Sequence, residues 1–252
     1  MSKDSWLAAL TDQATQFRAA VTAGDPDQTL ATPVPSCPGW SVADLVAHLG
    51  SVYERIAGCL QRAGAPPDRK NVPVAPSGTD VLEWWDERLR IVQQALGDAE
   101  PDNPAWHQFH KPQHAEFYQR RAAHETAVHR WDAQLSIGLP DPIDPPELAA
   151  DGVAEVLDTF LPSDSSLTER ISVTGVVRLT ATDIDAHWVV RIRENGVTLL
   201  DTASWFDTEP DVAAATEATA SDLLLALWGR IPVSVTDNKG EPALIELLRV
   251  RR

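Results

Sequence analysis

Apolar positions recur at three- and four-residue steps over four long segments in the first half of the chain, which is the pattern of amphipathic helices. In the second segment the apolar stripe consists of Leu45, Leu49, Val52 and Ile56. Connections rich in proline, glycine and polar residues separate the segments, and consecutive helices of this length favour an antiparallel four-helix bundle. The predicted helices cover Asp4–Ala23, Val42–Arg62, Thr79–Leu96 and Pro112–Ser136.

Two of these helices carry clear signals where they begin. Ser41 suits the N-cap of the second helix, and Asp44 three residues later completes a capping box. Pro112 suits the first turn of the fourth helix, because a backbone N–H there would have no partner within the helix. The capping signals therefore agree with the hydrophobic pattern on where the second and fourth helices begin.

The second half of the chain opens with a predicted helix over Glu147–Leu161 and then changes to a β pattern. Apolar and more polar positions alternate along Trp188–Arg193, as in a half-buried strand, and Asn195-Gly196 is a strong hairpin signal. Strands are predicted at 176–181, 188–193, 197–200 and 212–219, and further helices at 222–228 and 241–249. We therefore expect an α+β protein, with a helical bundle over residues 1–163 and a small α+β domain over 164–252.

Charge and composition restrict the classes of function. The chain of 252 residues holds 37 acidic and 21 basic residues, a net charge of −16, so it repels phosphate backbones and anionic membrane surfaces and is not expected to bind nucleic acid. No apolar run approaches the roughly 20 residues of a membrane-spanning helix, and the N-terminus has no signal-peptide pattern. The two cysteines form neither a disulfide framework nor a CxxC motif, which fits a cytoplasmic protein.

The candidate chemistry lies on the fourth predicted helix. His124 and His129 are five residues apart, about 140° around a helix, so they cannot easily share an ion. Glu125 and His129 are four apart, about 40° around the helix, and can meet one ion from neighbouring turns. His48 on the second helix would add a third ligand, and zinc best suits two imidazoles and a carboxylate. Spacing alone leaves an alternative open, in which Glu125 and His129 are an exposed i,i+4 pair and His48 is a hydrogen-bonded histidine of the core.

Two further residues near this segment have weaker signals. Cys37 precedes a helix N-terminus, a position that can lower the pKa of a thiol, but no base is placed beside it and we expect a structural role. Asp132 stands one turn beyond His129. It is either a carboxylate that orients a ligand or a structural residue.

Two stretches in combination resemble the mycothiol-dependent maleylpyruvate isomerase family, which belongs to the DinB-like metalloenzyme superfamily. They are SCPGWSVADLVAHL at 36–49 and AHETAVHRWDA at 123–133, while SDLLLALWGR at 221–230 looks like the family's second domain, which is similar to sterol carrier proteins. The resemblance implies a divalent metal, usually zinc, bound by a His, a Glu and a His that match His48, Glu125 and His129. It also implies mycothiol as a thiol cofactor.

The resemblance further implies an enzyme whose metal stabilises the cofactor sulfur as a thiolate, a nucleophile at neutral pH. Its partners would be a low-molecular-weight thiol and a small electrophilic substrate. We expect an S-transferase in preference to the maleylpyruvate isomerase itself, because a shared fold does not fix the substrate. A non-catalytic protein that binds or senses a thiol or small ligand stays open, as does a metal-dependent hydrolase. Monomer and homodimer are both compatible with the sequence.

An anionic substrate or cofactor needs a cation, and arginine suits carboxylates because it makes bidentate contacts. The family's second domain contributes to its pocket, so the resemblance makes Arg230 the expected catalytic residue. Arg88, Arg90 and Arg121 are lesser candidates. The alternative for Arg230 is a structural role at the end of a helix, where a positive charge faces the helix dipole favourably.

Overall fold

The computed structural model describes residues 1–66, 73–201 and 211–250. Contacts divide the chain into two compact units, Met1–Asp141 and Pro142–Arg252. The boundary predicted at residue 163 lies later than this division. The reason is that helix α6 (Pro146–Glu155) packs against helix α9 (Ala220–Leu227). The segment 142–163 therefore belongs to the second unit.

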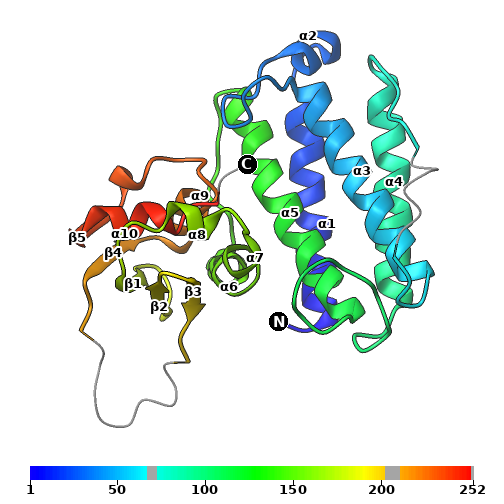
Figure 1. Cartoon of the computed structure of the whole chain (residues 1–252). Coiled ribbons are helices and arrows are strands. Elements are labelled where there is room, and N and C mark those ends of the chain that lie inside the picture. Colours follow the sequence, from blue (N-terminus) through cyan, green and yellow to red (C-terminus); the bar gives the residue numbers. More distant parts are fainter. Residues whose placement is uncertain (67–72, 202–210, 251–252) are drawn as a thin grey trace. The chain divides into compact units, whose positions relative to one another are not determined.

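In the described part of the first unit there are four long helices and one short helix, and the long ones form the predicted bundle (Figure 1). They are α1 (Lys3–Val21), α2 (Pro26–Ala31), α3 (Val42–Gln61), α4 (Asp80–Asp98) and α5 (Ala115–Ser136). Helices α1 and α3 each pack against both α4 and α5, which closes the bundle. The short helix α2 was not predicted, although Asp25 caps it and Pro26 stands in its first turn.

Neighbouring helices of the bundle do not all run antiparallel. Gly50 on α3 faces Trp84 on α4, and one turn further along both helices Glu54 pairs with Arg88 at 2.6 Å. These two helices therefore run parallel, while α1 runs antiparallel to α4 and α3 runs antiparallel to α5.

The predicted ends of the long helices agree with the structure to within a few residues. The largest shift is at α5, which begins at Ala115 and not at Pro112. The carbonyl of Gln113 accepts a hydrogen bond from the backbone N–H of Ala105, which keeps this stretch extended. No helix among the described residues is long and apolar enough to cross a membrane.

The second unit contains helices and a mixed sheet, which confirms the α+β class. Its helices are α6, a π-helical turn η1 (Val156–Phe160) that continues α6, α7 (Leu161–Ser163), α8 (Leu167–Arg170), α9 (Ala220–Leu227), the 3-10 turn η3 (Val233–Val235) and α10 (Pro242–Leu247). Its strands are β1 (Gly175–Ala181), β2 (His187–Arg193), β3 (Gly196–Leu199), β4 (Ala214–Ala218) and β5 (Asp237–Gly240).

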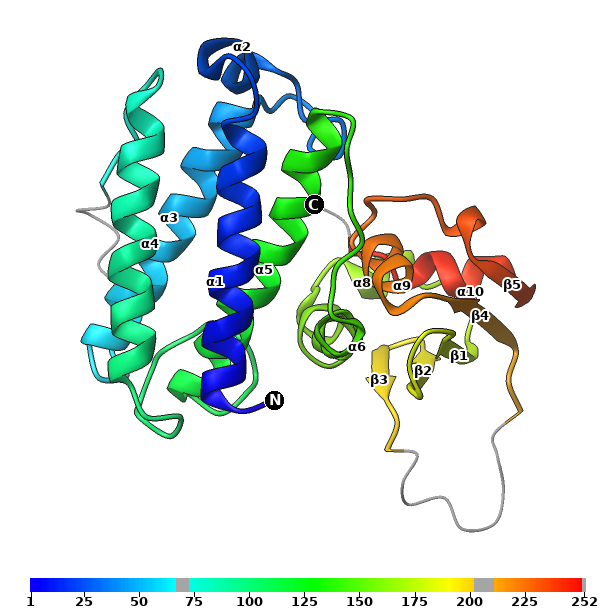
Figure 2. The ribbon, with the colours of Figure 1, turned by 180° about the vertical axis from the view of Figure 1, so that it is seen from behind.

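The described strands form one sheet in the order β3-β2-β1-β4-β5, and among them only the β1–β4 pair is parallel. Gly196, with a φ of 136°, permits the predicted turn between β2 and β3. Helices α9 and α10 cover the face that carries Leu179 and Thr216 (Figure 2). Strand β5 was not predicted, because its four residues are exposed and join the sheet through their backbone.

Candidate functional site

Helix α3 carries the first residue of the candidate site. Its start is fixed by the predicted capping box: the hydroxyl of Ser41 accepts a hydrogen bond from the backbone N–H of Asp44 at 3.2 Å, and the Asp44 carboxylate accepts one from the backbone N–H of Ser41 at 2.8 Å. Further along α3, the side chain of His48 is 32% exposed. Its Nε2 lies 3.2 Å from Oε1 of Glu125 on α5.

Helix α5 carries Glu125 and His129 one turn apart, and both side chains are buried. Nε2 of His129 lies 3.3 Å from the same carboxylate oxygen that faces His48. One donor atom from each of the three side chains therefore lies within 4.8 Å of the other two. His124, as its spacing requires, points elsewhere: its ring meets Trp6 of α1 edge-on, with 5.2 Å between ring centroids.

The donor atoms of this trio fit a divalent ion. Two ligand atoms that each lie about 2.0–2.1 Å from a tetrahedral zinc ion are about 3.3 Å apart. The separations of 3.2 and 3.3 Å from Oε1 of Glu125 to the two imidazole nitrogens match that value. Among the described residues, Nε2 of His129 has no hydrogen-bond partner although it is buried. A buried nitrogen without a hydrogen bond is costly unless something else, such as a metal ion, binds it.

Arg121 lies one turn before Glu125 on α5, and its guanidinium pairs with Oε2 of that carboxylate. Burial raises the pKa of Glu125, but the charge of Arg121 and the imidazoles of His129 and His48 beside the carboxylate outweigh this effect and hold the pKa well below its ordinary value. The carboxylate therefore stays ionised. Arg121 was a lesser candidate for binding an anionic substrate; in the structure its charge is engaged by Glu125.

The second ring nitrogen of His129 has a partner of its own, because Nδ1 lies 2.8 Å from Oδ2 of the fully buried Asp132. Burial lowers the pKa of His129, but the carboxylates of Asp132 and Glu125 raise it by more, so the pKa is above its ordinary value. The surroundings of the ring thus favour a positive charge. A cation bound at Nε2 of His129 would be stabilised by these carboxylates in the same way as a proton.

Two residues beside the trio were not predicted as part of the site. The indole of Trp40 lies against the imidazole of His48, with 4.9 Å between ring centroids, and the hydroxyl of Ser36 donates to Oδ1 of Asp132 at 2.6 Å. Both belong to the stretch SCPGW that precedes α3. That stretch carried the family resemblance, but no chemical role had been assigned to either residue.

Two models of protein families match this chain. The model of the mycothiol maleylpyruvate isomerase N-terminal domain matches residues 7–134, and the model of the MDMPI C-terminal domain matches residues 147–247. This chain belongs to the mycothiol maleylpyruvate isomerase family.

Two solved structures share the fold of this family member. A crystal structure of a substituted mycothiol-dependent maleylpyruvate isomerase has a TM-score of 0.61 at 10% identity, covering 96% of this chain and 95% of that one. A second crystal structure of mycothiol-dependent maleylpyruvate isomerase has a TM-score of 0.59 at 11% identity, covering 92% and 90%. At such low identity these matches support the fold alone. No curated protein matches the sequence.

The arginines expected to bind an anion in this family member differ in their surroundings. Arg230, in the second unit, follows α9, is half-buried and donates from Nη1 to the carbonyl of Trp228 at 3.0 Å. Its catalytic role stays a prediction. Arg88 and Arg90 on α4 each pair with a glutamate of the bundle.

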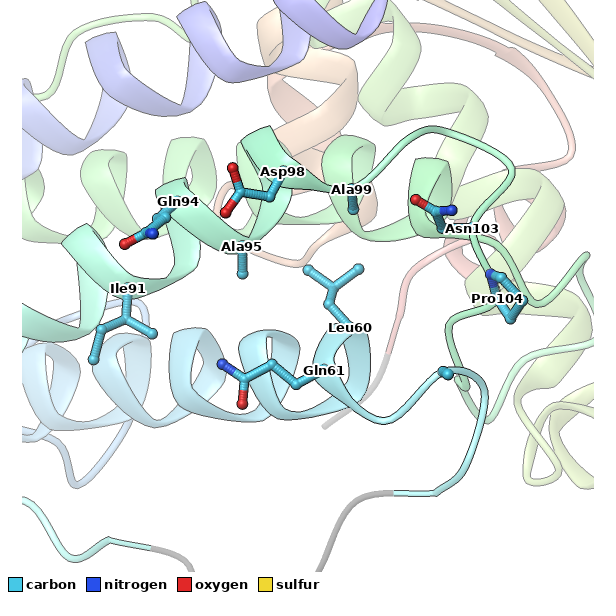
Figure 3. A pocket seen from close by; sticks show the side chains of 10 residues that line it. Leu60, Gln61, Ile91, Gln94, Ala95, Asp98, Ala99, Asn103 and Pro104 are labelled. Carbon is cyan, nitrogen blue, oxygen red and sulfur yellow. The ribbon is translucent and has the colours of Figure 1, made fainter.

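A cavity of about 610 Å³ lies elsewhere in the bundle, between the last turns of α3 and α4 (Figure 3). Its lining includes Leu60 and Gln61 on α3 and Ile91 and Asp98 on α4. Leu60 follows His48 by 12 residues on the same helix, which places it about 18 Å further along the axis. This cavity is therefore separate from the candidate metal site.

Proposed function

We propose that this member of the mycothiol maleylpyruvate isomerase family is a metal-dependent enzyme that uses mycothiol to isomerise a small electrophilic substrate of the maleylpyruvate type. The observation that carries the proposal is the convergence of His48, Glu125 and His129 from two helices on one point. Isomerisation replaces S-transfer as the preferred reaction, because both similar solved structures are described as mycothiol-dependent maleylpyruvate isomerases.

His48, Glu125 and His129 would hold the ion, and zinc suits this set of two imidazoles and one carboxylate. A divalent ion supplies the charge that stabilises a thiolate over a thiol and so makes a nucleophile available at neutral pH. Three protein ligands leave a tetrahedral ion one further position. The side chain of His48 is 32% exposed beside the half-buried Trp40, which would leave a cofactor room to approach this position.

The residues around the trio prepare it for this role. Arg121 holds the second oxygen of Glu125 and leaves the first directed at the two imidazoles. Glu125 contributes one negative charge, so the ion and its ligands keep a net positive charge that attracts an anionic thiolate. Maleylpyruvate carries carboxylates, and Arg230 is the residue we propose to bind one of them.

The reaction class is tested with zinc-loaded protein, mycothiol and maleylpyruvate, followed by chromatography, which separates isomers of equal mass, and by mass spectrometry, which detects a thiol conjugate. With mycothiol present in far less than stoichiometric amount, isomerisation should continue to completion, because the thiol is returned after each turnover. The product should have the same mass as the substrate. His48→Ala should abolish the activity. His187→Ala, which changes an exposed histidine of the second unit, should leave it unchanged.

The other outcomes identify the alternatives. A conjugate with the summed mass of thiol and electrophile, formed in proportion to the thiol consumed, would establish an S-transferase. Thermal stabilisation by mycothiol without turnover would indicate a binding or sensing protein. Turnover that needs no thiol would indicate a metal-dependent hydrolase. Failure of the protein to take up any divalent ion would refute all the catalytic versions together.

A further inference from the structure

Asp132 is fully buried on α5 and makes no contact with solvent. Donors around its carboxylate include the hydroxyl of Ser36 at 2.6 Å from Oδ1, and Nδ1 of His129 at 2.8 Å and Sγ of Cys37 at 3.7 Å from Oδ2. A buried carboxylate needs such partners to remain ionised. An ionised carboxylate only accepts hydrogen bonds, so its neighbours must donate.

This requirement decides where the proton of His129 resides. A hydrogen bond of 2.8 Å between Nδ1 and the Asp132 carboxylate places a proton on Nδ1. In the neutral ring, Nε2 then carries the lone pair, and Nε2 is the atom that lies 3.3 Å from Oε1 of Glu125. We propose that Asp132 is a positioning residue that keeps His129 in the tautomer whose Nε2 binds the ion. The proposal rests on the ion centre described under the proposed function.

The loop before α3 takes part in the same arrangement. Ser36 and Cys37 lie in a tight turn, where the backbone N–H of Cys37 donates to the carbonyl of Val34 and that of Trp40 donates to the carbonyl of Cys37. This turn leads directly into α3, the helix of His48. By binding both the turn and His129, Asp132 ties the start of α3 to the helix that carries the other two ligands.

A different reading of the cluster makes it a metal site in its own right, since one donor atom each from Cys37, His129 and Asp132 lies within 4.8 Å of the others. The separation of 2.8 Å between Nδ1 of His129 and Oδ2 of Asp132 argues against this reading. It is a hydrogen-bond distance, whereas two ligands of one zinc ion are about 3.3 Å apart. The geometry therefore favours Asp132 as a partner of the ligand.

The test measures zinc affinity by competition with a chelator. Asp132→Asn keeps the shape of the side chain but can donate to Nδ1, which would favour the wrong tautomer, and we expect zinc to bind about 10- to 100-fold more weakly. Asp141→Asn is the matched control, because Asp141 also accepts a hydrogen bond from a side chain of α5, that of Gln134, but does not touch the trio. It should bind zinc like the unchanged protein.

The tautomer itself provides a second measurement. Long-range ¹H–¹⁵N spectra of the metal-free protein, recorded where His129 is neutral, should show the proton on Nδ1 in the unchanged protein and on Nε2 in Asp132→Asn. If Asp132→Asn does not fold, Ser36→Ala replaces it. Loss of that single hydrogen bond to Oδ1 should weaken zinc binding about fivefold.

Cobalt distinguishes the two readings of the cluster. With Co²⁺ in place of zinc, the protein should bind one equivalent and show no thiolate-to-cobalt charge-transfer band, and Cys37→Ser should change neither result. A thiolate band that disappears in Cys37→Ser would overturn the inference, as would unchanged zinc affinity in both Asp132→Asn and Ser36→Ala. If the unchanged protein binds no ion, the proposed function itself fails, and that result is distinct from either of these.

Discussion

Replacing Arg121 with methionine removes the guanidinium that pairs with Oε2 of Glu125, while most of the length and apolar surface of the side chain remain. Both residues are only 8% exposed, so the carboxylate left behind would be poorly solvated. Breaking a buried ion pair in this way costs about 3–5 kcal/mol of folding free energy. His129 offsets part of the loss, since its imidazole can hold a proton beside Glu125, and we expect a loss of about 3 kcal/mol in the metal-free protein.

A divalent cation held by Glu125 would neutralise the same carboxylate. In the zinc-loaded protein we therefore expect Arg121→Met to lose only about 1 kcal/mol, the contribution of a pair that is already compensated. In a cooperative unit of roughly 150 residues, a loss of 3 kcal/mol lowers Tm by about 10 °C and a loss of 1 kcal/mol by about 3 °C.

The assay is thermal unfolding followed by far-ultraviolet circular dichroism, once with a chelator and once with excess zinc. Arg90→Met is the control, because Arg90 pairs with Glu87 on the exposed surface of α4, where solvent screens the pair, and its Tm should stay nearly unchanged in either condition. Equal losses for Arg121→Met with and without zinc would refute the reasoning, since the ion would then not compensate Glu125. The reasoning would also be refuted if, without metal, Arg121→Met were as stable as the unchanged protein.

The further predictions concern α3. Ser41→Ala should cost about 1 kcal/mol at neutral pH. Hydrogen bonds from the backbone and hydroxyl of Ser41 lower the pKa of Asp44 below its ordinary value of 3.8. The contribution of Asp44 to the free energy of unfolding is therefore fully present above pH 3.8 and is lost as the pH falls through its folded-state pKa. Urea unfolding at several pH values measures both effects. Gly50→Ala should destabilise the protein, because the added Cβ would lie 2.2 Å from the ring of Trp84. Gly58→Ala on the same helix meets no atom within 4 Å and should stabilise by about 0.5–1 kcal/mol in the same unfolding experiment.

The helices of the bundle could be predicted to different degrees. In α3 the apolar stripe is clear and the capping box marks the first turn, so the predicted and observed starts agree at Val42. In α5 almost every side chain between Tyr118 and Gln134 is buried, polar ones included, so burial does not follow one apolar stripe. These polar side chains are buried because they pair with each other and with other helices, as when Nε of Arg130 donates to Gln13 of α1 at 3.0 Å. Such pairing between distant segments leaves no periodic signal.

The candidate site could be predicted in part for the same reason. A spacing of four residues puts Glu125 and His129 on one face of any helix, so their proximity follows from the sequence. Whether His48 meets them depends on which helix lies beside α5. The contacts of Trp40 and Ser36 depend on the path of the loop before α3, which has no periodicity to interpret.

By itself, then, the sequence determined where the long helices lie, how α3 begins and where Gly196 turns the chain. Caps, turns and amphipathic stripes involve residues a few positions apart, and their energies act in any tertiary arrangement. The tertiary structure alone decided that α3 runs parallel to α4, that α6 belongs to the second unit, and that the polar strand β5 completes the sheet. The same apolar stripes can be buried in several helix arrangements, and only the packing of the whole chain selects one of them.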